Sequence, residues 1–207
     1  YHVEKILGEG GMGVVYRCRH TIIGKKVAMK VLRADLARNS EVTERFLNEA
    51  KSASSIGNPH IIDISDFGRL PDGSTYFVME YLEGEALANL VDKGGPVPAA
   101  RLLHIAEQLA EGLYAAHQAG IVHRDLKPDN IFLCEGKDGS PRPPKVLDFG
   151  ISKLYDEGGG QSLTRTGMAM GTPQYMSPEQ LSALPDMDGR VDVYAMGVVL
   201  YECLTGR

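Results

Sequence analysis

The sequence predicts an α+β protein with a strand-rich part over residues 1–80, a connection at 81–84 and a helix-rich part over residues 85–207. Runs of β-branched and aromatic residues separated by glycine and proline turns predict the strands. Apolar residues at helical spacing over residues 98–119 predict a long helix. The absence of an internal repeat favours two unequal lobes of a single domain.

In the first part we expect several strands and a single helix. The strands are predicted over residues 14–19, 26–32, 61–68 and 75–80. The helix is predicted over 41–54, where apolar residues recur at helical spacing.

In the second part, Gly120 follows the predicted helix 98–119 at a suitable C-terminal stop. Short strands are expected at 131–133 and 145–147, around a charged loop rich in glycine and proline. The glycine-, serine- and threonine-rich stretch 156–166 is typical of a mobile loop.

The composition indicates a globular protein with no nucleic-acid partner. Of the 207 residues 43% are hydrophobic and 24% charged, and the net charge of -5 argues against a nucleic-acid-binding face. Three widely spaced cysteines form no Cys-x-x-Cys pair, which favours buried, reduced thiols over disulfides or a zinc site.

No part of the sequence predicts a membrane span or a signal peptide. The longest apolar run, 191–204, contains Asp192 and Glu202 and is too short to cross a bilayer. We therefore expect a cytoplasmic location, with a membrane anchor only outside this span.

Two polar blocks carry the predicted chemistry: His123-Arg124-Asp125-Leu126-Lys127-Pro128-Asp129-Asn130 and Asp148-Phe149-Gly150. Phosphoryl transfer from a nucleotide needs a carboxylate for the attacking hydroxyl and a cation for the γ-phosphate. It also needs oxygen ligands for magnesium, which an amide and a second carboxylate supply.

The segment Gly8-Glu9-Gly10-Gly11-Met12-Gly13 fits the pattern G-x-G-x-x-G, which dinucleotide-binding folds also use. A dinucleotide site requires a helix directly after the glycines. Here Val14-Val15-Tyr16 predicts a strand, which favours a loop between two strands that covers phosphates.

Together these motifs resemble the eukaryotic-type (Hanks-type) serine/threonine protein kinases, and the sequence is similar to bacterial members. The resemblance implies the two-lobed protein kinase fold, with ATP and Mg²⁺ as cofactors. It covers all 207 residues, but the family domain is longer, so the resemblance implies a C-terminal truncation that omits the last helices.

Lys30 ends the apolar run Val27-Ala28-Met29-Lys30, where an ammonium needs a partner. Glu49 and Glu44 on the predicted helix are the candidates, and Glu49 is favoured because Phe46 and Ala50 pack beside it. In the family this ion pair holds the lysine on the α- and β-phosphates.

The resemblance also implies the nucleotide site. Val15, Ala28 and Phe132 would sandwich the adenine, Met79 would lie behind it, and the backbone from Glu80 to Leu82 would bind the base edge. The residues implied around the phosphates are Leu7, Gly8, Glu9, Gly10, Gly11, Gly13 and Lys30.

For catalysis the resemblance implies Asp125 as the base and Lys127 as the cation on the γ-phosphate. Asn130 and Asp148 would hold magnesium. Asp192 would accept hydrogen bonds from the backbone of the His123-Arg124 turn, and Phe149 would pack on His123.

Lys127 and the segment 171–179 resemble the serine/threonine branch, so the expected partners are protein substrates with Ser/Thr acceptors, including a second copy of the chain in trans. Thr172 would narrow the site for a short hydroxyl side chain. Phosphorylation is expected at Thr164 or Thr166, less so at Ser162, with Arg124 and Lys153 receiving the phosphate.

Two other functions stay open at this point. A pseudokinase scaffold would bind nucleotide without turnover, although Lys30, Asp125, Asn130 and Asp148 are all present. A small-molecule kinase of the aminoglycoside or choline type would lack the long activation segment, which runs from Asp148 to Glu179 here.

Overall fold

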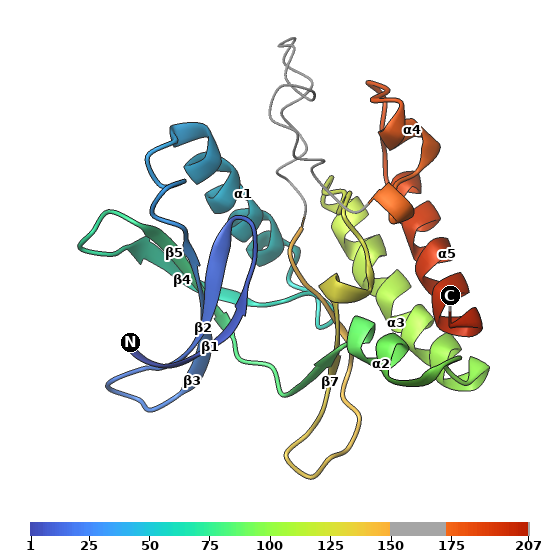
Figure 1. Ribbon diagram of the computed structural model, residues 1–207, viewed down its shortest axis with the longest axis horizontal. Coiled ribbons are helices and arrows are strands. Elements are labelled where there is room, and N and C mark those ends of the chain that lie inside the picture. The colour runs from blue at the N-terminus through green and yellow to red at the C-terminus, as the bar shows by residue number, and fades with distance from the viewer. Residues whose placement is uncertain (150–172, 207) are drawn as a thin grey trace. The chain divides into compact units, whose positions relative to one another are not determined.

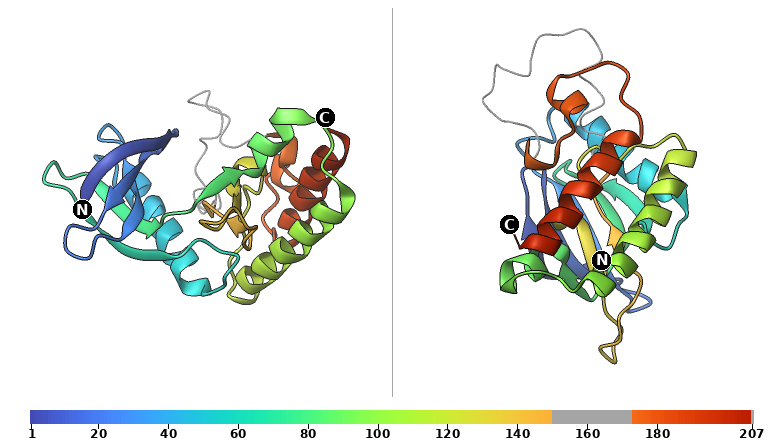
Figure 2. Two further views of the ribbon diagram at one scale, coloured as in Figure 1. Left: turned by 90° about the horizontal axis from the view of Figure 1, so that it is seen from below. Right: turned by 90° about the vertical axis from the view of Figure 1, so that its right-hand side faces the viewer.

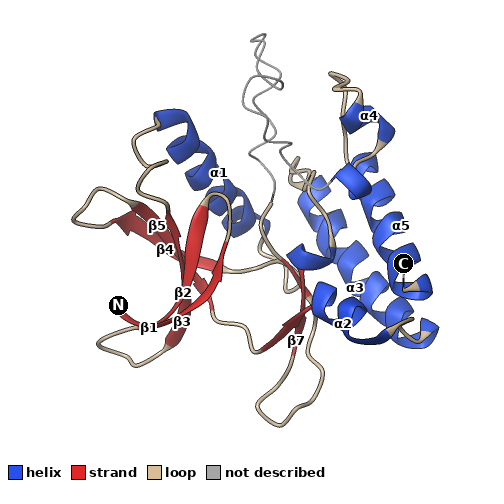
Figure 3. Cartoon of the chain, in the orientation of Figure 1, coloured by secondary structure: helices blue, strands red, loops and turns tan. Residues whose placement is uncertain are grey.

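The computed structural model describes residues 1–149 and 173–206 (Figure 1). The chain divides into two compact units, which we call unit 1 (Tyr1–Gly57 and Ile62–Glu83) and unit 2 (Asn58–Ile61 and Gly84–Arg207). Figure 3 shows that strands dominate the first unit and helices the second.

Unit 1 is built on a five-stranded antiparallel sheet with the strand order β1-β2-β3-β5-β4. Its strands are β1 (His2–Glu9), β2 (Gly13–Arg19), β3 (Lys26–Leu32), β4 (Ile64–Arg69) and β5 (Thr75–Glu80). The predicted strands 14–19, 26–32 and 75–80 are thus confirmed within one residue.

Two strands differ from the prediction. The strand expected from Ile61 begins only at Ile64, because Ile61 belongs to unit 2, where it forms a parallel bridge with Val146. β1 was predicted only as the strand before the glycine loop, without bounds, because its residues are almost all exposed and no alternation of buried and exposed side chains marks it.

Helix α1 (Ser40–Ile56) is the only long helix in the described part of unit 1 and confirms the helix predicted over 41–54. The side chain of Asn39 accepts hydrogen bonds from the backbone N–H groups of Glu41 and Val42 and so caps its N-terminus. Phe46 packs on Phe77 of the sheet, with ring centroids 4.9 Å apart.

The sheet therefore has two distinct faces. On the face that α1 covers, Leu32 and Phe77 form a buried cluster with Phe46 and Ala50 of the helix. On the opposite face, which we call the outer face, the buried side chains are Cys18, Val27, Met29 and Val78, with Tyr16, Val31 and Tyr76 packed against them.

Unit 2 combines helices with a three-stranded sheet of order β6-β7-β8. Its strands are β6 (Gly84–Ala86), β7 (Ile131–Cys134) and β8 (Lys145–Val146), its helices α2 (Leu87–Gly94), α3 (Ala99–Gln118), α4 (Pro178–Leu181) and α5 (Arg190–Thr205), and its 3₁₀ turns η1 (Pro128–Asn130) and η3 (Pro173–Tyr175).

Helix α3 of unit 2 follows the sequence pattern. α3 matches the predicted helix, and Gly120 just beyond it has φ 73°, the left-handed conformation that favours glycine. α3 and α5 lie side by side in both views of Figure 2. None of the described helices is long and apolar enough to cross a membrane.

β6 and α2 were not predicted as separate elements. Gly84, the first residue of β6, has φ 134°, and a Cβ at this position would overlap the carbonyl oxygen of Leu133 on the neighbouring strand. Only glycine fits, so the residue that the sequence suggested as the end of a connection is the start of a strand.

Candidate active site

The glycine-rich segment joins β1 to β2. Leu7, Gly8 and Glu9 end β1, Gly10 and Gly11 form the turn, and Gly13 opens β2. The N–H of Gly10 donates to the carbonyl oxygen of Gly13 over 2.9 Å and closes the turn. The predicted loop between two strands is present, and no helix follows the glycines.

The glycines of this turn differ in what they allow. A Cβ on Gly8 or Gly11 would meet no atom within 4 Å, so their backbone is open to a ligand. A Cβ on Gly13 would lie 2.5 Å from the carbonyl oxygen of Val31. Gly13 is therefore required for the pairing of β2 with β3, which the motif alone does not indicate.

Strand register brings four of the predicted nucleotide residues together on the face of the sheet opposite the outer face. Val15 of β2 is the direct partner of Lys30 on β3, and Ala28 is the partner of Met79 on β5. Ala28 and Lys30 are two residues apart on one strand, so their side chains share a face.

The predicted ion pair is present in unit 1. The Nζ atom of Lys30 lies 2.8 Å from Oε1 of Glu49, and the two side chains are 12% and 10% exposed. Glu44, the competing candidate, is exposed on α1. Helical spacing places Glu49 beside the buried Phe46 and Ala50, which is why it reaches the sheet.

Glu80 ends β5, and Leu82 follows it. The backbone N–H of Glu80 donates to the carbonyl oxygen of Asp63 over 3.0 Å, and the Glu80 carboxylate accepts from the N–H of Asp63 over 3.0 Å. The N–H of Glu80 is thus engaged within unit 1, and only other backbone groups of this segment remain to bind a base edge.

Residues 123–130 of unit 2 form a turn that we call the polar turn. Asp192 holds this turn in place, as the resemblance implied. Its buried carboxylate accepts hydrogen bonds of 2.8 Å from the backbone N–H groups of His123 and Arg124. Burial by itself would raise the pKa of Asp192, but the hydrogen bond with His117 and those from the turn outweigh it and hold the pKa below its ordinary value.

Asp125, Lys127 and Asn130 lie together on this turn. Nζ of Lys127 is 4.0 Å from Oδ2 of Asp125. Nδ2 of Asn130 donates to the carbonyl oxygen of Asp125 over 2.8 Å and lies 3.4 Å from its Oδ2. Because the amide nitrogen of Asn130 faces Asp125, its Oδ1 faces the other way and is available as an oxygen ligand.

Asp148 follows β8 next to the same turn. The N–H of the preceding Leu147 donates to the carbonyl oxygen of Asn130 over 2.8 Å. Phe149 is buried, and its ring lies 4.8 Å from that of His123 between centroids, so the predicted packing is confirmed.

Backbone strain concentrates at these positions. In the described part of the chain, the non-glycine residues with positive φ are Arg124 (63°), Asp148 (42°) and Ala183 (48°). Arg124 lies in the polar turn and Asp148 lies next to it, and such conformations persist where the surrounding structure imposes them.

The oxygen atoms of Asn130 and Asp148 suit Mg²⁺, which prefers few protein oxygens and completes its shell with water and phosphate. No group of three or more His, Cys, Asp or Glu side chains that could hold a metal exists among the residues that the structure describes. The two oxygen donors of Asn130 and Asp148 fit magnesium that is held together with a phosphate ligand.

Phe132 lies on β7, where it pairs with Ala86 of β6 and Lys145 of β8. It belongs to unit 2, together with Asp125, Lys127, Asn130 and Asp148, whereas the other predicted nucleotide residues belong to unit 1. The predicted site residues thus form two sets, one within each unit.

Sequence reasoning missed two supports of the polar turn. Ser177 is fully buried, and its side chain caps α4 together with Gln180. Nε2 of Gln180 donates to the carbonyl oxygen of Arg124 over 2.8 Å. The pattern Ser-x-x-Gln is a helix-capping signal that would have indicated this role.

The second missed support is His117, whose Nε2 lies 2.8 Å from Oδ2 of Asp192. The predicted phosphorylation sites Thr164, Thr166 and Ser162, and also Lys153 and Thr172, lie outside the described residues.

Unit 1 has a lysine–glutamate pair and a glycine turn, and unit 2 has an ordered Asp-Lys-Asn turn; both are features that protein kinases use. The comparisons with known proteins agree. The family model described as "Protein kinase domain" matches residues 1–207. The chain belongs to this family.

Its relatives include serine/threonine-protein kinase pkn3 of Myxococcus xanthus, 44% identical over 207 residues, which are 100% of this chain and 38% of the relative. PknB of Mycolicibacterium smegmatis is 41% identical over 210 residues, covering 100% of this chain and 32% of PknB. The chain thus spans about a third of the length of these curated relatives.

Among solved structures, the PknI kinase domain of Mycobacterium tuberculosis matches with a TM-score of 0.74 at 30% identity, covering 99% of this chain and 73% of that one. The predicted α+β protein kinase fold and the predicted resemblance to bacterial serine/threonine-protein kinases are confirmed.

Proposed function

We propose that this chain transfers the γ-phosphoryl group of ATP to serine and threonine hydroxyls of proteins. The observation that carries the proposal is the ordered turn on which Lys127 and Asn130 lie within 4.0 Å of the Asp125 carboxylate. The serine/threonine kinases among its relatives support the choice of acceptor.

In the proposed mechanism Asp125 accepts a hydrogen bond from the acceptor hydroxyl and orients it toward the γ-phosphate. Asp192 and the Asn130 amide hold the backbone on both sides of this carboxylate. Because this backbone is already held in place, the turn loses little conformational entropy when the acceptor binds. Lys127 neutralises negative charge on the γ-phosphate.

Asn130 and Asp148 would hold magnesium, which when bound neutralises charge on the phosphates. Lys30, oriented by Glu49, would bind the α- and β-phosphates of the same nucleotide, under the backbone of residues 7–13. Val15, Ala28, Met79 and Phe132 would contact the base, with backbone groups from Glu80 to Leu82 at its edge. We further propose residues 1–80, 81–84 and 85–207 as N-lobe, hinge and C-lobe of one catalytic domain.

The proposed partners are proteins with exposed serine or threonine, including a second copy of the chain, whose Thr164 and Thr166 are the proposed acceptors. The proposed place of action is the cytoplasm, where ATP is available and free thiols persist. The three cysteines are buried and form no disulfide, and burial raises the pKa of the Cys203 thiol to about 11.

The test is phosphate transfer from γ-labelled ATP with Mg²⁺ to casein, comparing the protein with Asp125→Asn. We expect the turnover to fall by roughly 10²- to 10⁴-fold. Asp129→Asn is the matched control, because it makes the same change at an exposed carboxylate of the same turn and should keep its activity. Phosphoamino-acid analysis and mass spectrometry of the same reaction identify the acceptors.

Undiminished transfer by Asp125→Asn, or label on tyrosine, would contradict the proposal. If the unaltered protein binds nucleotide but transfers no phosphate, it is a pseudokinase scaffold. If it labels a small-molecule alcohol and no protein, it is a small-molecule kinase of the aminoglycoside or choline type.

A further inference from the structure

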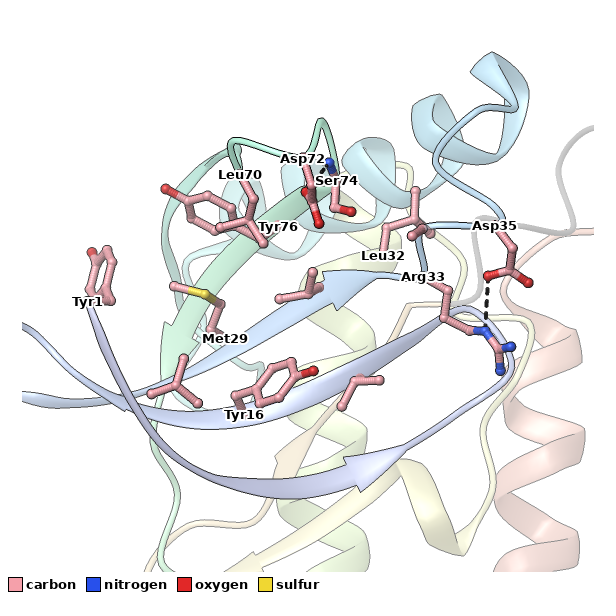
Figure 4. A pocket seen from close by; sticks show the side chains of 14 residues that line it. Tyr1, Tyr16, Met29, Leu32, Arg33, Asp35, Leu70, Asp72, Ser74 and Tyr76 are labelled. Atoms are coloured by element: carbon pink, nitrogen blue, oxygen red, sulfur yellow. Dashed lines mark hydrogen bonds and ion pairs between the residues drawn. The ribbon is translucent and has the colours of Figure 1, made fainter.

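The outer face of the unit 1 sheet contains a pocket of about 650 Å³ (Figure 4). The start of β1, strands β2 and β3, the turn between β4 and β5, and the residues just after β3 line it. All fourteen lining residues belong to unit 1 and are described. The volume lies within the range of small-molecule sites, roughly 300–1,000 Å³.

This pocket is separate from the predicted nucleotide residues. Val14, Tyr16, Met29 and Val31 line it, and these residues alternate along β2 and β3 with Val15, Ala28 and Lys30. Successive side chains of a strand point to opposite faces. A ligand in the pocket and a nucleotide would therefore lie on opposite sides of the same strands.

The floor of the pocket consists of aromatic rings and a flexible thioether side chain. Figure 4 shows the Met29 side chain between the rings of Tyr16 and Tyr76. The Tyr76 ring covers Gly68, its partner in the sheet. A Cβ at Gly68 would be only 2.7 Å from the tyrosine hydroxyl, so only glycine leaves room for the ring. A thioether between aromatic rings suits a flat aromatic ligand.

The charged side chains that line the pocket are negative on balance. Nε of Arg33 lies 3.2 Å from Oδ1 of Asp35, so these two charges offset each other. Asp72 adds a further carboxylate, which is oriented at the rim by a hydrogen bond of 2.9 Å from the N–H of Ser74. A negative rim above tyrosine faces favours a cation and disfavours an anion.

We propose that this outer-face pocket is a second ligand site, distinct from the nucleotide site, for a compact aromatic molecule with a positive charge. The proposal does not rest on catalytic activity, because it concerns binding to unit 1 alone. Nucleotides, carboxylates and phosphates are the wrong charge for this rim.

The test uses two probes with the same ring and opposite charges, tryptamine and indole-3-acetate, added to protein labelled with ¹³C at the methionine methyl groups. Met29 lies in the pocket, whereas Met79 packs with the cluster on the opposite face. The two methyl signals, assigned with Met29→Leu and Met79→Leu, therefore report on the two faces separately.

We expect tryptamine to shift the Met29 signal saturably, with a dissociation constant on the order of 1 mM or tighter, and to leave the Met79 signal in place. Indole-3-acetate should bind at least about threefold more weakly, because the negative rim repels its carboxylate.

Val14→Trp fills the pocket and should weaken tryptamine binding at least about tenfold, and Tyr16→Leu, which removes a ring, provides a second weakened variant. Val193→Trp makes the same change at a residue of α5 that is 65% exposed and should bind tryptamine normally. The proposal is overturned if Met79 shifts in place of Met29, if the two probes bind equally, or if neither pocket variant weakens binding.

Discussion

Lys30 and Glu49 meet at 2.8 Å with little exposure to solvent. Charges taken out of water lose hydration, and an apolar pair of similar size is often as stable or more so. The ion pair is therefore poorly explained by stability alone. A requirement for a fixed ammonium group on the sheet face, such as a phosphate ligand imposes, explains it better.

This interpretation predicts opposite effects of single and double replacement. Glu49→Leu removes the carboxylate that lies 2.8 Å from the buried Lys30 ammonium and should lower the free energy of unfolding by about 3–5 kcal/mol. The double variant Lys30→Met/Glu49→Leu should recover most of that loss and still fail to transfer phosphate. Denaturant unfolding and the transfer assay measure both, with Glu44→Leu as the exposed control. A double variant less stable than Glu49→Leu would contradict the argument.

At the residue scale, the sequence predicts charged partners well where a helical period selects between candidates, as it does between Glu44 and Glu49. The sequence predicts contacts poorly where a residue has no charge or other chemical feature that suggests a particular partner. Ser177 is a small uncharged residue to which the sequence analysis gave no role, yet it is buried and caps α4. Gly13 reads as a phosphate-loop glycine, yet the carbonyl of Val31 explains its lack of a side chain.

At the scale of elements, Asp192 joins three parts of unit 2. It enters α5 from its first turn, contacts His117 in the last turn of α3, and accepts the backbone N–H groups of the His123-Arg124 turn. This one carboxylate connects the long helices to the turn that carries Asp125. Its ionised form is favoured in the folded protein, since its pKa is lowered there.

The lowered pKa predicts how stability depends on pH. A carboxyl group whose folded pKa lies below its unfolded value of about 3.9 contributes stability above that pH and loses it as the pH falls through the folded pKa. Asp192→Asn should therefore lower the free energy of unfolding by about 2–3 kcal/mol at pH 7, and this difference should shrink below about pH 4.

Urea unfolding at pH 7, 5, 4 and 3 measures the difference, with Asp186→Asn at an exposed position as the control. A difference between Asp192→Asn and the unaltered protein that stays constant down to pH 3 would show that ionisation of this group does not stabilise the fold.

The elements that the sequence predicted share a clear signal in their own residues. α3 has buried side chains at helical spacing, and β3 has a central run of apolar residues. The bounds of β1 were not predicted because the strand is almost wholly exposed. β6 was missed because its three residues start at a glycine whose conformation depends on Leu133 of another strand. Such contacts between distant segments are not encoded in local periodicity.

At the scale of the whole molecule, the predicted site residues are divided between two units that are linked by 83–84 and by the short stretch 57–62. The sequence supplied both sets through motifs that are local within each unit. Whether the two sets act on one nucleotide is a property of the assembled protein, and it can be measured as an energetic coupling between a residue of unit 1 and a residue of unit 2.

Binding of ATP with Mg²⁺ to four proteins measures this coupling: the unaltered chain, Lys30→Met, Asp148→Asn and the double variant. If both side chains hold the same triphosphate, each single variant weakens binding, and the two effects fail to add by about 0.5–3 kcal/mol. Lys30→Met combined with Asp129→Asn, an exposed carboxylate of unit 2, should be additive. Effects of Lys30→Met and Asp148→Asn that add to within about 0.3 kcal/mol would mean that the two sets act independently. The proposed catalytic arrangement would then be wrong even though each set has the predicted internal contacts.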